Sequence, residues 1–225
     1  GVACRTMEMF NAFGFADRVL KEAYWVNETT FWSPDGETGN AITRSGRVQD
    51  TEDGLSEFPH VILNQARVHD FYLDRMANSP AQLKPHYGRR LLEVHTTDTD
   101  CDFPVTARFE RVQEGQPNVI ETIRARYVVG CDGARSMVRK SMGRTLKGDS
   151  ANQAWGVMDV LARTDFPDIR MKSAIHSSSE GNLLIIPREG GYLVRLYIEL
   201  DELQSGERVA SRNITADHLV SVAKK

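Results

Sequence analysis

The feature that most constrains the fold is a segment in which an apolar stretch runs into a glycine-rich turn and then a helix, RYVVGCDGARSMVRK at 126–140. Residues 127–129 are predicted to form a buried strand, and the helix that follows is predicted to end at Gly143. Asp132 then stands at the carboxyl end of the strand, where open α/β folds bind ligands. The start of the helix is expected to offer free N–H groups to a phosphate. The alternative is a simple Asp-Gly turn between strand and helix.

Apolar spacing before this segment predicts helices and short strands. Residues 2–13 carry apolar side chains at helical spacing, and Gly14 ends that helix. Asp17 is predicted to cap a short second helix. The remaining elements predicted here are a strand at 24–32, an exposed acidic loop at 45–57, a short strand at 60–63 and an amphipathic helix at 65–76.

Period-two apolar spacing dominates the second half of the chain. Three antiparallel strands are predicted between residues 91 and 123, and further strands at 154–162 and 183–200. A last helix is predicted to open at Thr215. This order predicts a mixed α+β fold with largely antiparallel sheets. We expect residues 1–150 to form one domain and residues 151–225 to begin a second.

Composition excludes several classes of function. Lys and Arg number 28 and Asp and Glu number 31, so the formal net charge is −3 and no basic field attracts nucleic acid or an anionic membrane. No apolar stretch is long enough to span a bilayer. The three cysteines lack a CxxC pair, which indicates reduced thiols and a cytoplasmic protein. The histidines are scattered without ligand spacing, and no metal site is predicted.

The pattern Gly-Cys-Asp-Gly, two residues, Ser136, two residues and Arg139 resembles the Asp-Gly motif of FAD-dependent aromatic hydroxylases, the phenol 2-monooxygenase and 3-hydroxybenzoate 4-monooxygenase group. The resemblance extends over nearly the whole chain, including GVACRT at 1–6 and LNQAR at 63–67. It implies a p-hydroxybenzoate hydroxylase-like fold, with residues 1–150 as a partial FAD-binding domain and 151–225 as the start of the substrate domain. The residues that it assigns to the cofactor are Gly1, Val2, Arg5, Gln65, Asp132, Gly133, Arg139 and Tyr197.

The same resemblance assigns the substrate side. FPDIR at 166–170 and IIPR at 185–188 are similar to the family's substrate sheet, which implies that Arg188 lies near the flavin and that Tyr197 faces both flavin and phenol. His60 matches a histidine near the substrate, whereas a lone histidine is more often an ordinary hydrogen-bonding residue. Lys172 matches a lysine of the 3-hydroxybenzoate enzymes. A cation in an apolar pocket needs an anion, so Lys172 is predicted to meet a substrate carboxylate; the alternative is a solvated lysine at a strand edge.

These assignments imply a flavoprotein monooxygenase. It is expected to use non-covalent FAD, NADPH and O2 to hydroxylate a small aromatic substrate through a flavin hydroperoxide. The predicted substrate is 3-hydroxybenzoate, and the alternatives are a phenol 2-monooxygenase and a truncated domain that binds without catalysing. The chain has no initiating Met, which indicates a longer parent. The resemblance implies a glycine-rich phosphate loop before Gly1 and a Gly-Asp motif after Lys225, and the parent is expected to be a homodimer.

Overall fold

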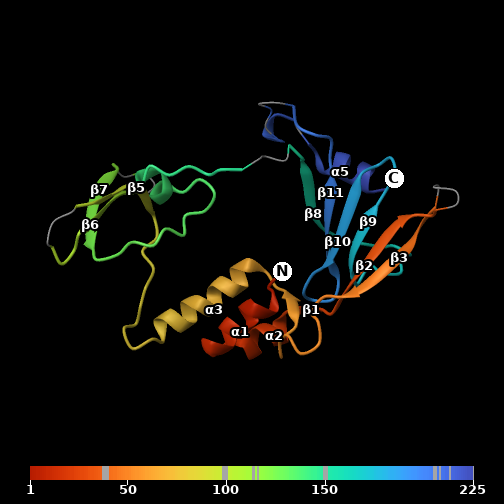
Figure 1. The fold of residues 1–225 in the computed structure, drawn as a ribbon, viewed down its shortest axis with the longest axis horizontal. Helices are drawn as coiled ribbons and strands as arrows, with labels where there is room; N and C mark the ends of the chain where they lie inside the picture. The colour runs from red at the N-terminus through yellow and green to blue at the C-terminus, as the bar shows by residue number, and fades with distance from the viewer. Residues whose placement is uncertain are drawn as a thin grey trace. The chain divides into compact units, whose positions relative to one another are not determined.

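In the computed structural model the chain folds as two compact units (Figure 1). Unit 1 comprises Gly1–Gln82 together with Ala151–Lys225, and unit 2 comprises Leu83–Ser150. No helix in the described part of the chain is long and apolar enough to cross a membrane. The structure describes residues 1–36, 41–97, 101–112, 115, 117–148, 152–204, 207, 209–212 and 214–224.

A helical layer with its own core forms one part of unit 1. Its elements are the helices α1 (Cys4–Ala12), α2 (Ala16–Glu22) and α3 (Gln65–Ala77) and the antiparallel strands β1 (Tyr24–Val26) and β4 (His60–Ile62). Apolar side chains spaced three and four residues apart on the helices meet in one buried cluster. Its largest members are Phe10, Phe71, Met7 and Phe15. The helices predicted at 2–13 and 65–76 and the strand predicted at 60–63 are confirmed.

The other part of unit 1 is a six-stranded sheet in the order β3-β2-β9-β10-β11-β8. Neighbouring strands are antiparallel except β2 and β9, which are parallel. The prediction of a largely antiparallel sheet is therefore confirmed. The strands are β2 (Glu28–Pro34), β3 (Ile42–Gln49), β8 (Trp155–Leu161), β9 (Lys172–His176), β10 (Asn182–Pro187) and β11 (Leu193–Glu199).

One face of this sheet is covered by α5 (Ala216–Ala223), which follows the short 3-10 helix η1 (Val209–Arg212). Leu219 packs so closely on β8 that a Cβ built on Gly156 would lie 2.2 Å from its Cδ2. Ile198 of β11 belongs to the same buried cluster. Because side chains alternate along a strand, Arg195 and Tyr197 of β11 point to the opposite face.

Unit 2 combines a three-stranded antiparallel meander with a short helix. Its elements are β5 (Arg89–Thr96), β6 (Val105–Arg111), β7 (Val119–Ala125) and α4 (Met137–Ser141). The backbone N–H of Val94 donates a hydrogen bond of 3.0 Å to Ser141 Oγ, which fastens α4 to β5. Val138 of α4 packs on Gly130, where an added Cβ would lie 2.7 Å from the valine Cβ. The three predicted antiparallel strands are confirmed.

The prediction of a buried strand at 127–129 is wrong. These residues form no strand, and the side chains of Tyr127 and Val129 are 86% and 83% exposed. The reason is that no described strand of unit 2 pairs with them. An apolar sequence can propose a strand, but only a partner strand can satisfy its backbone N–H and C=O groups.

Local boundaries in unit 1 also differ from the predictions. The predicted loop at 45–57 begins within β3, which reaches Gln49 because its backbone pairs with β2. Asp17 lies in the first turn of α2, whose N-cap is Phe15. The strand predicted at 24–32 is divided into β1 and β2 at Asn27, and β9 has no counterpart among the predicted strands.

The predicted domain boundary at residue 150 coincides with one end of unit 2. However, β2 and β3 share a sheet with β8, β9, β10 and β11, so this sheet draws strands from both sides of that boundary. The roles assigned to the two segments, cofactor binding and substrate binding, stay a prediction.

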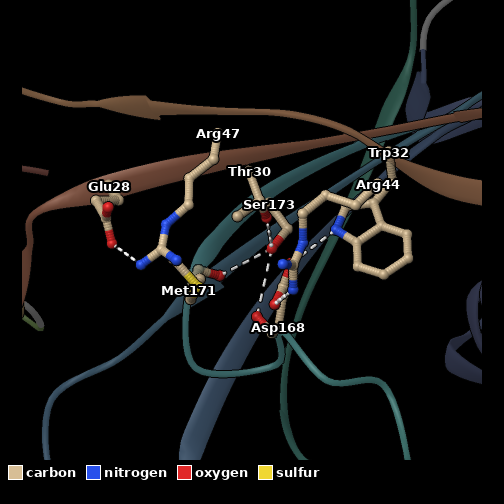
Figure 2. A network of polar contacts seen from close by, with 8 residues as sticks. All are labelled: Glu28, Thr30, Trp32, Arg44, Arg47, Asp168, Met171 and Ser173. Carbon is tan, nitrogen blue, oxygen red and sulfur yellow. Dashed lines mark hydrogen bonds and ion pairs between the residues drawn. The ribbon is translucent and has the colours of Figure 1, made fainter.

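A buried carboxylate fastens the parallel pair β2 and β9 (Figure 2). Asp168 precedes β9 and is 3% exposed. Its Oδ2 accepts hydrogen bonds of 2.9 Å from Trp32 Nε1 and from Arg44 Nε, and its Oδ1 pairs with the second Arg44 nitrogen. Beside it, the Oγ1 of Thr30 lies 2.8 Å from the Oγ of Ser173 across the two strands. Burial alone raises the pKa of Asp168, but the hydrogen bonds outweigh it and hold the pKa below its ordinary value.

We predict that Asp168→Ala lowers the free energy of unfolding by about 2–3 kcal/mol. The change leaves the Trp32 donor and the Arg44 charge without their partner, and Arg44 recovers part of the loss because it can be rehydrated. Urea unfolding followed by tryptophan fluorescence measures the effect. The matched control is Asp165→Ala, an exposed carboxylate in the same loop, which should shift stability by less than about 0.5 kcal/mol. Equal shifts in the two variants would contradict the prediction.

Candidate functional site

Four residues that the sequence assigned to a cofactor or substrate line one cavity of unit 1. The cavity has a volume of about 670 Å³, within the range of small-molecule sites. Its apolar wall comes from α1 and α3 and the residue that follows β4, and it consists of Phe10, Val68, Tyr72 and Leu63. The four assigned residues are Gly1, Val2, Gln65 and Arg188. Arg195 lines the cavity too and is its second cation, after Arg188.

Backbone pairing fixes the rim of this cavity. The N–H of Val2 donates to the carbonyl of Val61 at 2.7 Å, and the N–H of Val61 donates back at 2.9 Å. Asn64 caps α3, because its Oδ1 accepts a hydrogen bond of 2.9 Å from the N–H of Ala66. Gln65 is therefore the first residue of α3 and stands at the cavity rim.

Arg188 is the buried cation of the cavity. It directly follows β10 and is 8% exposed. Its Nη2 donates a hydrogen bond of 2.9 Å to Glu189 Oε1, whereas its Nε is buried without a hydrogen-bond partner among the described residues. Glu189 Oε2, in the same ion pair, is likewise buried without a partner among the described residues, and each such buried polar atom costs about 1–3 kcal/mol.

A cluster of three polar side chains connects β3, β4 and β9 through Asp50, the residue that directly follows β3. Asp50 Oδ2 lies 2.7 Å from His60 Nδ1, and Asp50 Oδ1 lies 3.2 Å from Lys172 Nζ. The side chains are largely buried, with exposed fractions of 14% for Asp50, 17% for His60 and 28% for Lys172. Burial raises the pKa of Asp50, but the hydrogen bonds from His60 and Lys172 outweigh it and hold the pKa below 3.8. We call these three residues the Asp50 triad.

The Asp50 triad is adjacent to Gly1. A Cβ built on Gly1 would lie only 2.3 Å from His60 Nε2, so this nitrogen approaches the backbone as only glycine allows. The cations Arg188, Arg195 and Lys172, from the end of β10, β11 and β9, all lie close enough to the Gly1 backbone nitrogen to act on it electrostatically.

Strand register places Tyr197 on the same sheet face as Lys172. Tyr197 pairs with Leu184, and Leu184 pairs with Ala174, two residues along β9 from Lys172. Directly opposed residues in an antiparallel pair share a face. Arg195 lies on this face too, and its Nε and Nη2 donate to Asp159 at 2.7 and 2.8 Å. These hydrogen bonds raise the pKa of Arg195, burial opposes them, and a further hydrogen bond with Tyr197 adds to the rise.

Arg5 does not join this arrangement. Its side chain is 84% exposed and pairs with Glu8 at 3.2 Å on the surface of α1. Thr6, the next residue, lines the cavity instead. Within unit 1, no described contact of the Arg5 side chain supports the prediction that it binds a cofactor.

In unit 2 the Asp-Gly segment forms a capped turn. The Asp132 carboxylate accepts hydrogen bonds from the backbone N–H groups of Met137 (2.6 Å) and Val138 (3.2 Å) and from the Ser136 hydroxyl. Ser136 in turn caps α4, because its Oγ accepts from the N–H of Arg139 at 3.0 Å. Gly133 adopts φ +74°, the conformation that favours glycine. Hydrogen bonding from Ser136, followed by the two backbone donors, lowers the pKa of Asp132 against the effect of burial.

Comparison with known proteins identifies the family. The family described as an FAD binding domain matches residues 1–224. The chain belongs to this family.

Curated relatives of this FAD binding domain are monooxygenases. The chain is 65% identical over 225 residues to 3-hydroxybenzoate 4-monooxygenase of Comamonas testosteroni, covering 100% of this chain and 35% of the relative. It is 39% identical to the FAD-dependent monooxygenase terD of Aspergillus terreus (99% and 37% covered) and 33% identical to the phenol 2-monooxygenase fsqG of Aspergillus fumigatus (100% and 36%). The chain thus spans about a third of the length of these relatives.

Solved structures share the fold. p-Nitrophenol 4-monooxygenase PnpA from Pseudomonas putida matches with a TM-score of 0.66 at 19% identity, covering 93% of this chain and 50% of that one. The flavin-dependent monooxygenase PieE, in complex with FAD and substrate, matches with a TM-score of 0.65 at 17% identity, covering 94% and 38%. The predicted fold, that of FAD-dependent aromatic monooxygenases, is confirmed.

One inference about the Asp-Gly segment of this FAD binding domain is corrected. The N–H groups at the start of α4 are not free for a phosphate, because those of Met137 and Val138 donate to Asp132 and that of Arg139 donates to Ser136. The roles of Asp132, Gly133 and Arg139 toward a cofactor stay predictions. In this structure Asp132 stabilises the turn, which is the alternative that the sequence left open.

Nothing in the sequence indicated Asp50 directly. It lies in the acidic stretch predicted as an exposed loop, where one carboxylate among several looks ordinary. The available signal was indirect. A histidine and a lysine that are both expected at a partly buried site need a counter-charge.

We predict that protonation of Asp132 loosens α4 in the FAD binding domain. Because the folded pKa is lowered, the stabilisation is fully present above the ordinary pKa of 3.8 and is lost as the pH falls below it. Hydrogen exchange at the Met137 and Val138 amides, corrected for its intrinsic pH dependence, should be protected from about pH 5 to 7 and lose protection below about pH 4.

Asp132→Ala should remove the same protection at neutral pH, by about fivefold or more. Asp102→Ala, an exposed carboxylate of unit 2, is the control and should leave it unchanged. Protection of these amides that persists in Asp132→Ala would reject the capping role.

Proposed function

We propose that the protein containing this chain is an FAD-dependent monooxygenase that hydroxylates 3-hydroxybenzoate with NADPH and O2. The observation that carries the proposal is the Asp50 triad beside Gly1, because it presents a lysine and a histidine together next to a cavity suited to a cofactor. The 65% identity to 3-hydroxybenzoate 4-monooxygenase over the whole chain supports the same substrate.

The cavity residues fit a flavin ring. We assign a carbonyl or ring nitrogen of the isoalloxazine to the unpaired Arg188 Nε, and Gly1 lines the same cavity. Gln65 at the start of α3 and the apolar wall complete the cradle. When bound, FAD supplies the oxygen-activating chemistry after reduction by NADPH. The residues of this chain bind and orient the ring, exclude water and manage protons.

The sheet face beside the cavity suits a hydroxybenzoate. We assign the substrate carboxylate to the Lys172 ammonium and the His60 ring, and the phenolic hydroxyl to Tyr197. Strand spacing separates the backbones of Lys172 and Tyr197 by about 12 Å, a gap that two long side chains and one aromatic ring can fill. The Tyr197 hydroxyl can accept or donate a proton at the phenol oxygen, which increases the electron density of the ring that is hydroxylated.

A second candidate function is phenol hydroxylation. The observation that favours it is the ion pair between Lys172 and Asp50, because a lysine already paired with a carboxylate does not require a second anion. The 33% identity to a phenol 2-monooxygenase is in keeping with this alternative.

We predict that Lys172→Met weakens binding of 3-hydroxybenzoate by about tenfold to a hundredfold, because a partly buried carboxylate loses its cation. Binding of phenol, which has no carboxylate, should change by less than about twofold. Flavin fluorescence titration of the FAD-loaded protein, prepared at the length of its relatives, measures both affinities. Lys21→Met, which removes an exposed lysine of α2, is the control. Equal small effects on both ligands would favour the phenol hydroxylase.

We also predict that Tyr197→Phe preserves flavin content and substrate affinity within about threefold but lowers kcat by about a hundredfold, because only a proton-handling hydroxyl is lost. Oxygen electrode assays combined with product quantification measure turnover and the product formed per NADPH consumed. Tyr192→Phe is the matched control, since this tyrosine is 82% exposed. Unchanged turnover in Tyr197→Phe would remove the residue from the mechanism.

A further inference from the structure

The Asp50 carboxylate determines which nitrogen of His60 carries a proton. A carboxylate whose pKa is held below 3.8 accepts hydrogen bonds and does not donate them. Since Asp50 Oδ2 lies 2.7 Å from His60 Nδ1, this nitrogen must be the N–H donor. In a neutral imidazole the other nitrogen, Nε2, is then an acceptor. Nε2 is the nitrogen that faces Gly1.

This protonation form has a consequence for the ligand. A neutral His60 can accept a hydrogen bond from a hydroxyl but cannot pair with a carboxylate, because both groups would be acceptors. A protonated His60 donates from both nitrogens, one toward Asp50 and one toward Gly1. Lys172 Nζ pairs with Oδ1, the other oxygen of the Asp50 carboxylate. Asp50 therefore holds the lysine and the histidine next to each other.

We propose that binding of an aromatic carboxylate at the Asp50 triad takes up a proton from solvent onto His60 Nε2, and that Asp50 is the positioning residue that makes this uptake possible. The inference rests on the proposed function, because its ligand is the substrate assigned there. One N–H bond forms at Nε2, and one bond to hydrogen breaks in the solvent species that gives up the proton, hydronium or the buffer acid; no other bond changes. With the proton, the charges of Asp50, His60, Lys172 and the bound carboxylate sum to zero; without it, they sum to −1.

The surroundings of His60 determine how readily it takes up the proton. Asp50 favours the charged ring, whereas the positive charge of Lys172 opposes it. A ligand carboxylate between Lys172 and His60 adds a second negative charge and shifts the balance toward the charged ring. His60 also lines a second cavity of about 520 Å³, whose carboxylates, from β2 and from the loop after β3, favour the charged ring too; they are Glu28, Glu52, Asp53 and Glu57.

Calorimetry tests the uptake directly. Titration of 3-hydroxybenzoate into the FAD-loaded protein at about pH 8, where an ordinary imidazole is neutral, is compared between two buffers of different ionisation enthalpy. We expect about one proton taken up per ligand bound and none with phenol. Asp50→Asn should abolish most of the uptake and weaken 3-hydroxybenzoate binding by about tenfold to a hundredfold. Asp17→Asn, which changes an exposed carboxylate on α2, should behave as wild type.

A second measurement needs no ligand and remains informative if Asp50→Asn folds poorly. NMR of the imidazole nitrogens in the wild-type protein at about pH 8 should show His60 protonated at Nδ1. Protonation at Nε2 instead would overturn the inference. Binding of 3-hydroxybenzoate without proton uptake would overturn it as well and leave the proposed function standing. Failure of 3-hydroxybenzoate to bind the wild-type protein would reject both.

Discussion

The parallel pairing of β2 with β9 is the contact on which the rest of unit 1 depends. It joins Thr29 through Trp32 to Lys172 through Ile175 and so brings together strands that are distant in sequence. Parallel strands need a long connection, and here the connection contains α3 and the whole of unit 2. Without this pair, Asp50 and His60 would have no relation to Lys172. The candidate site is therefore a product of sheet topology, and no continuous segment of the chain contains it.

Two buried carboxylates beside this pair have different consequences. The charge of Asp168 is met by Arg44 and Trp32, whose donors hydrogen-bond to both of its carboxylate oxygens and hold the strands together (Figure 2). The charge of Asp50 is met by His60 and Lys172, and each of these keeps a polar atom for another partner. The same requirement, that a buried charge be paired, yields a structural link in one case and a candidate binding point in the other.

The requirement that buried polar groups be paired also applies to the cavity that Gly1 lines. Arg188 is buried with one donor unpaired among the described residues, an arrangement that costs stability. Such a cost is expected where a ligand provides the missing acceptor, and its place beside Gly1 and Gln65 agrees with membership of the FAD binding domain family. The capped turn at Asp132 in unit 2 differs, because its polar groups satisfy one another.

The sequence by itself determined the family, the helices and most strands, since those depend on local periodicity and on a motif of fixed spacing. It also identified His60, Lys172, Arg188 and Tyr197 as residues of interest. Only the tertiary structure decided which of them meet, that Arg5 stays in solvent, and that Asp50 joins His60 to Lys172. It also decided against a strand at 127–129. The physical reason is the same in each case. Ion pairs and strand pairing depend on partners distant in the chain, and local sequence carries no record of where those partners lie.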